Sequence, residues 1–459
     1  STPLYSSAAS DVYKRQIDVH RISEYPEVQN VINSLLSELN DSNLIKNSPR
    51  KRILKHLKVV VLDLYVAYLG DPLVYVSYPR SKDAYRQDQR MKQLFLGYGP
   101  MTTVINGLAS LGYLEDHRGF YDQGRKTGFQ SRMRATPKLI DLIENYSVAP
   151  SMISLEDDQL IILRDADKED IPYGATDETS AMEATLQSYN AFLSMYELAL
   201  SLPTEEVRDF LQSRRIAPID FTRNRLYRIF NEDFTSGGRF YRGWWQNIPR
   251  ELRQHITIDG EPCSELDYSG QHLLLLYGLE GDEYRWLKGL NDDPYYLEDY
   301  GEDVRSLLKV AVLILVNETS ETKAIRAIRQ KINYDFSYLD STDDYIKSLI
   351  EALTAKHPEI KDQLFSGKGG ELQYQDSQIA EYVLKDMKAR GQPVLPVHDS
   401  FIVQDKYLAH LYSSMKEAYR MLGVDSIPEV KILSLIHISE PTRRYAIWEA
   451  GVGVEKKRG

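Results

Sequence analysis

The feature that most constrains this sequence is an apolar segment interrupted by His398 and Asp399. Residues 394–403 (VLPVHDSFIV) place a β-rich run on each side of these two polar residues. Two strands joined by so tight a turn pair antiparallel, so the segment predicts a β-hairpin with a carboxylate at its tip. Residues 377–390 carry apolar side chains at helical spacing, which predicts a helix just before the hairpin.

A second aspartate, Asp267, lies in comparable surroundings. It stands near the end of a strand-like run in the segment ELDYSGQH and is followed by the apolar residues 273–277. The pattern predicts a strand that delivers Asp267 to the start of a helix. On its own the pattern is ambiguous, because aspartate is also a common N-cap.

Two cations follow at helical spacing. Arg305 and Lys309 are four residues apart in a segment that continues as an apolar helix to Asn317, so both side chains lie on one helix face. Taken without the other segments, the two residues are best explained as solvated charges on an amphipathic helix.

The segment TSGGR, ending at Arg239, and the segment QNIP, which begins with Gln246 and Asn247, precede the first aspartate. The glycines allow close approach of backbone to a ligand, and the guanidinium can contact a phosphate or a base edge with two donors.

In this order and spacing, the four segments resemble the palm and fingers of the family A DNA polymerases over residues 231–432. The resemblance implies that Asp267 and Asp399 hold two Mg²⁺ ions and that Arg305 and Lys309 grip the incoming triphosphate, with Lys309 able to protonate the pyrophosphate. It also implies further contacts to the nucleotide and to the primer–template. The nucleotide contacts include Tyr268, His272 and Asn317, and the primer–template contacts are Arg239, Gln246, Asn247 and His398.

Three positions depart from the family pattern. His272 stands where a glutamate is expected to screen the sugar 2′ position, Asn317 where an aromatic residue is expected, and Ser400 where a glutamate usually follows the second aspartate. The segments SGQH and HDSF are also similar to those of phage-type single-subunit RNA polymerases, which share this palm. The choice between deoxyribose and ribose therefore stays open.

Upstream, residues 91–146 predict a helix at 101–111, a short strand, a basic hairpin at 118–134 and a second helix at 137–145. This order resembles a winged helix-turn-helix module, which would lay its first helix in the major groove of DNA. A small packing unit without a ligand is the alternative. The cations expected to contact the DNA backbone from the hairpin are Arg125, Lys126, Arg132 and Arg134.

The formal net charge of −11 argues mildly against nucleic acid as a partner, but basic residues are concentrated locally. Residues 214–253 hold nine arginines against four acidic residues. No apolar run approaches the ~20 residues that span a bilayer, and the single cysteine, Cys263, fits a reducing cytosol. The sequence therefore predicts a cytoplasmic protein with no membrane partner.

We expect an α+β protein with five segments. Residues 1–16 and 433–459 resemble translated sequencing-adaptor sequence and are treated as non-native. Residues 17–150 form the winged-helix-like region, residues 151–230 a helical connector with thumb-like helices, and residues 231–432 the antiparallel palm and helical fingers.

The leading hypothesis for the function is a DNA-directed DNA polymerase of a phage, plasmid or mobile element, which adds dNTPs to the 3′-hydroxyl of a DNA primer–template. One alternative is an RNA-synthesising primase or single-subunit RNA polymerase that uses NTPs. Another is a non-catalytic DNA-binding replication or regulatory protein.

Overall fold

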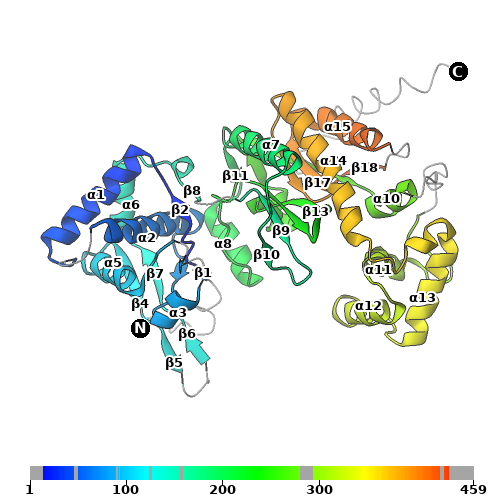
Figure 1. The fold of residues 1–459 in the computed structure, drawn as a ribbon, viewed down its shortest axis with the longest axis horizontal. Coiled ribbons are helices and arrows are strands. Elements are labelled where there is room, and N and C mark those ends of the chain that lie inside the picture. Colours follow the sequence, from blue (N-terminus) through cyan, green and yellow to red (C-terminus); the bar gives the residue numbers. More distant parts are fainter. Residues whose placement is uncertain are drawn as a thin grey trace. The chain divides into compact units, whose positions relative to one another are not determined.

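The computed structural model describes residues 14–45, 50–88, 91–92, 94–122, 127–155, 159–279, 293–423 and 428–433 of the 459-residue chain. The chain forms two compact units. Unit 1 comprises residues 1–159, 200–225 and 242–248, and unit 2 comprises residues 160–199, 226–241 and 249–459. Figure 1 shows their elements in sequence colours.

Unit 1 is built on two long helices, α1 (Pro26–Asp41) and α2 (Arg50–Gly70). The apolar face of α1 is fully buried, and α2 packs against both α1 and α5 (Tyr98–Ser110). A four-stranded sheet has the order β1-β3-β7-β4. The remaining elements of residues 14–155 are β1 (Lys14–Gln16), β2 (Arg21–Ile22), β3 (Tyr75–Ser77), α3 (Lys82–Gln87), β4 (Leu114–His117), β5 (Phe120–Asp122), β6 (Thr127–Phe129), β7 (Arg132–Ala135), α6 (Pro137–Asn145), η1 (Pro150–Met152) and β8 (Ser154–Leu155).

The expected order of helix, strand, hairpin and helix is present in unit 1. It consists of α5, β4, the paired strands β5 and β6, then β7 and α6. Met101, Val104 and Leu108 of α5 are buried, as the helical spacing predicts. A DNA-binding role for this module stays a prediction.

A buried ion-pair network ties residues 200–225 to the start of unit 1. Arg21 is almost fully buried and donates to Asp63 at 2.6 Å and to Asp220 at 2.5 Å. Arg15 also pairs with Asp63. Arg15 belongs to β1, which pairs in parallel with β3, so the last three residues of segment 1–16 take part in the sheet. The same unit contains α8 (Thr204–Ser213) and η2 (Trp244–Gln246).

Unit 2 contains the predicted hairpin, formed by β16 (Val394–Val397) and β17 (Ser400–Gln404), and both strands are buried along their whole length. The hairpin lies in a six-stranded sheet in which β15 (Glu261–Tyr268) pairs antiparallel with β14 (Ile256–Ile258), β17 and β18 (Val430–Ile432). β11 (Leu198–Leu200) lies at the β14 edge. The structure therefore has the antiparallel sheet that the sequence predicts, in a mixed α+β fold.

A second sheet of unit 2 has the order β10-β9-β12-β13. Its strands are β9 (Ile161–Arg164), β10 (Asp170–Ile171), β12 (Tyr227–Asn231) and β13 (Asp233–Tyr241). The long helix α14 (Gly369–Ala389) packs against β13, α7 (Asp177–Leu193) and α15 (Leu408–Met421). A capping box between Thr176 and Thr179 fixes the start of α7.

Three helices between the two aspartates form a separate layer of unit 2 and lie together in Figure 1. These are α11 (Arg305–Asn317), α12 (Glu321–Asp335) and α13 (Asp343–Lys356). Ser320 and Thr342 cap α12 and α13 by accepting backbone hydrogen bonds. The short elements of unit 2 are α9 (Arg250–Arg253), α10 (Gln271–Leu279), η4 (Glu302–Val304), η5 (Pro358–Gln363) and η6 (Asp405–Tyr407). Within the described residues, no helix has the length and apolar character needed to cross a membrane.

Candidate active site

His398 and Asp399 form a two-residue turn at the tip of the β16–β17 hairpin. Val397 and Ser400 are register partners, so the chain reverses over these two residues alone. His398 has a φ of 58°, in the left-handed region that costs an ordinary residue ~1–2 kcal/mol. Such strain is typical of functional sites, where the surrounding structure holds a side chain in an unfavourable conformation.

The pairing of β15 with β17 brings the two predicted metal ligands together. Asp267 is the register partner of Ser400, the residue that follows Asp399. Burial and the neighbouring charges of Asp399 and Glu265 raise the pKa of Asp267 to about 7. Burial and the Asp376 carboxylate also raise the pKa of Asp399. Both carboxyl groups therefore lie in a confined site where negative charge is in excess.

The donor set of Asp267 and Asp399 fits Mg²⁺. No ion pair with a basic side chain involves either carboxylate in the part of the chain that the structure describes. Carboxylate oxygens are the ligands that Mg²⁺ prefers, and Mg²⁺ binds proteins through as few as one or two of them. Among the described residues, no group of three or more His, Cys, Asp or Glu side chains is arranged to hold a metal ion.

The two predicted cations of α11 differ in their surroundings. Lys309 is exposed and lies near enough to Asp267 to lower its pKa, which opposes part of the upward shift. Its ammonium is also 5.7 Å from the ring centroid of Tyr295. Arg305 forms an ion pair with Asp293. The structure thus places Lys309 beside the aspartate pair, whereas Arg305 is held by a carboxylate of its own.

Arg239, which the sequence predicts to contact the primer–template, is held by a buried network. Its Nε donates to Asp376 Oδ2 at 2.6 Å, and Gln271 Nε2 donates to Asp376 Oδ1 at 2.7 Å. The guanidinium also lies 3.1 Å from His272 Nε2. Since arginine can only donate, Nε2 is the acceptor and Nδ1 of His272 carries the proton. Burial lowers the pKa of His272, and Asp376 offsets part of that effect.

Asp376 was missed because the sequence predicts that the helix begins at Ser377, whereas α14 begins at Gly369. The signal was present. Asp376 stands three and four residues before the buried Ile379 and Ala380, on the same helix face. A carboxylate on an otherwise apolar face requires buried partners, which Arg239 and Gln271 provide. Gln271, Glu265 and Arg253 were missed because no local pattern marks their partners, which lie 105 residues from Gln271 in one case and 135 residues from Glu265 in another.

Tyr268 and Asn317 occupy positions that limit their predicted roles. The Tyr268 side chain is buried and donates to the Met415 carbonyl at 2.7 Å, so a nucleotide contact is restricted to its backbone. Asn317 is exposed at the end of α11 and donates to the Leu313 carbonyl at 2.7 Å. It also touches the start of α14, where a Cβ on Gly369 would fall 1.6 Å from its Oδ1.

The other predicted primer–template contacts are spread over both units. His398 is exposed at the hairpin tip, with its ring against Tyr241. Gln246 and Asn247 lie in unit 1, and their contact with a primer–template stays a prediction. Arg132 and Arg134 both lie over the ring of Tyr75, and Arg134 pairs with Glu115 at 2.7 Å. Arg125 and Lys126 lie outside the described residues.

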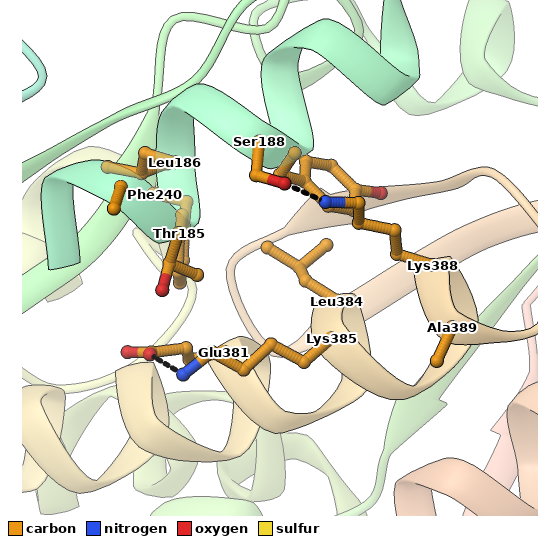
Figure 2. A pocket seen from close by; sticks show the side chains of 11 residues that line it. Thr185, Leu186, Ser188, Phe240, Glu381, Leu384, Lys385, Lys388 and Ala389 are labelled. Carbon is orange, nitrogen blue, oxygen red and sulfur yellow. Dashed lines mark hydrogen bonds and ion pairs between the residues drawn. The ribbon is translucent and has the colours of Figure 1, made fainter. Parts of the chain in front are cut away.

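A separate hollow of about 530 Å³ opens between α7 and α14. Figure 2 shows that two lysines lining the hollow form hydrogen bonds, Lys388 with Ser188 and Lys385 with Glu381. Its walls are mainly apolar, and neither Asp267 nor Asp399 lines it. The hollow is therefore distinct from the aspartate site.

Comparison with known proteins gives little beyond this geometry. No protein-family model matches the chain, and no curated protein matches it. Among solved structures, the chain is similar to the POL domain of Pol1 from M. smegmatis, in complex with DNA primer-template and dNTP. The identity is 12% and the TM-score 0.32, over 93% of this chain and 67% of that chain. A likeness this loose carries no argument about function.

Proposed function

We propose that this protein is a template-directed nucleotidyltransferase, most specifically a DNA-directed DNA polymerase of a phage, plasmid or mobile element. The observation that carries the proposal is the antiparallel pairing of β15 with β17, which brings Asp267 next to the hairpin turn that holds Asp399. The charges of Asp399 and Lys309 both act on the pKa of Asp267. In this proposal each of the four sequence segments that resemble polymerase motifs contributes a residue of unit 2 to the site, namely Arg239, Asp267, Lys309 and Asp399.

In this proposal Asp267 and Asp399 hold two Mg²⁺ ions, which would stabilise the attacking and leaving oxygens of an in-line phosphoryl transfer. Side chains of the protein would bind the triphosphate and the pyrophosphate. Lys309 neutralises charge on the triphosphate and on the departing pyrophosphate, because it is exposed and its charge acts on Asp267. Arg305 would join it after release from Asp293.

Arg239 is the proposed contact to the primer terminus. Asp376 accepts from its Nε, which fixes the plane of the guanidinium and leaves other donors for a base edge or phosphate. Pre-orientation of this kind reduces the entropy lost when substrate binds. Arg132 and Arg134 of unit 1 are the proposed contacts to the backbone of the template duplex.

Primer extension on a DNA template with Mg²⁺ tests the proposal, with dNTPs and NTPs offered in parallel. The proposal predicts extension with dNTPs. Extension with NTPs alone would assign the site to RNA synthesis, an alternative supported by the neutral His272 in place of the expected glutamate. Binding of duplex DNA without primer extension from either dNTPs or NTPs would favour a non-catalytic DNA-binding protein.

A further inference from the structure

Glu265 is a buried carboxylate two residues before Asp267 on β15. Side chains two residues apart on a strand point to the same face of the sheet, so both carboxylates face the same side. Glu265 is 3% exposed. Its charge acts on Asp267, which shows that the two groups interact across this face.

Both oxygens of Glu265 have partners. Ser400 Oγ donates to Oε1 at 2.5 Å, and Arg253 Nε donates to Oε2 at 3.1 Å. Ser400 directly follows Asp399 and pairs in register with Asp267. A single hydrogen bond therefore links Glu265, on the strand of the first aspartate, to the residue beside the second.

We propose that Glu265 is the third acidic group of the cation site and acts as a positioning residue through Ser400. It fixes the spacing of Asp267 and Asp399 and adds negative charge for a divalent cation, without ligating the cation itself. The inference rests on the proposed function.

A purely structural role for Glu265 is the competing explanation, since a buried Glu265–Arg253 pair could simply hold α9 against the sheet. The two explanations differ when the carboxylate is moved. If the negative charge at this location matters, a protein in which Glu265 and Ser400 are exchanged should regain the cation binding that is lost when the carboxylate is removed. If only the Arg253 pair matters, the exchanged protein should lose cation binding or stability.

Binding of Mn²⁺ to metal-stripped protein at pH 8, followed by electron paramagnetic resonance, provides the test. We expect Glu265→Gln to weaken Mn²⁺ binding by about 10-fold, the usual effect of losing an outer-shell partner. The double variant Glu265→Ser with Ser400→Glu should recover most of that loss. Glu261→Gln, at the exposed start of the same strand, is the matched control and should bind as wild type does.

Ser400→Ala is a second variant, which removes the hydrogen bond but leaves the Glu265–Arg253 pair that supports the fold. It should also weaken Mn²⁺ binding. Wild-type affinity in both Ser400→Ala and folded Glu265→Gln would overturn the inference, as would failure of the exchange to restore any binding. If wild-type protein binds no Mn²⁺, or if Asp399→Asn binds Mn²⁺ as well as wild type does, the proposed function is overturned, and the inference with it.

Discussion

Arg239 Nε donates to Asp376 Oδ2 at 2.6 Å, which joins the C-terminal part of β13 to α14. Asp376 is 1% exposed and also accepts from Gln271, so both of its oxygens are satisfied inside the protein. The pair positions the guanidinium that touches His272 and, with Gln271, links β13 and α10 to α14, the helix that precedes the hairpin.

Replacement of Asp376 by alanine should destabilise the protein by about 2 kcal/mol, because the half-buried Arg239 would lose its acceptor and Gln271 would lose its partner. Urea unfolding of unit 2 measures the change. Asp386→Asn on the same helix is the control, since its ion pair with Arg390 lies at the surface and contributes about 0.5 kcal/mol or less. Equal stability of the two variants would contradict a structural role for the Arg239–Asp376 pair.

His398→Gly should stabilise the fold by about 1 kcal/mol, because glycine adopts the left-handed conformation without the cost that histidine bears. The thermal midpoint should rise while nucleotide incorporation falls, as expected for strain retained at a functional turn. A variant that is less stable than wild type would show that the His398 side chain contributes more than its backbone conformation costs.

Asp267→Asn should raise the stability of metal-free protein at pH 8. The pKa of Asp267 is raised to about 7 from the ordinary 3.8. Between about pH 4 and 7 the native state therefore keeps a proton that the unfolded chain has lost, and above pH 7 it bears an unfavourable charge. Stability is therefore full below about pH 4, declines as the pH rises to about 7, and stays low above that.

The gain in Asp267→Asn should accordingly be smaller at pH 5 than at pH 8, and about 1 kcal/mol or more at the higher pH. Chemical denaturation at the two pH values, in the presence of a chelator, measures it. A gain that does not depend on pH would contradict the assigned ionisation.

Gly369→Ala should destabilise the protein by about 1 kcal/mol, although alanine is the better helix former, because its Cβ would push the exposed Asn317 side chain away from the Leu313 carbonyl. The double variant Gly369→Ala with Asn317→Ala should recover most of the loss, since the overlapping group is gone. Additive losses in the two single variants would show that the residues are not in contact.

The sequence predicts the elements that depend on local pattern. The β16–β17 hairpin, the strand that ends at Tyr268 and the helix after Arg305 all follow from periodicity and turn chemistry. The closeness of Asp267 and Asp399 required the resemblance to polymerases, because strand register between Asp267 and Ser400, more than 130 residues apart, has no local signal. Gln271 and Glu265 could not be predicted, since each is satisfied by partners that only the tertiary fold supplies. Asp376 could have been predicted from its place on an apolar helix face.

The central claim is tested most directly by single-nucleotide incorporation on a primed DNA template with Mg²⁺. Wild type and Asp386→Asn should extend the primer, whereas Asp267→Asn and Asp399→Asn should lose activity by at least about 1,000-fold, corresponding to ~4 kcal/mol of transition-state stabilisation. Equal extension by wild type and Asp399→Asn, or no extension by folded wild-type protein with either dNTPs or NTPs, would contradict the assignment of this site as a nucleotidyltransferase.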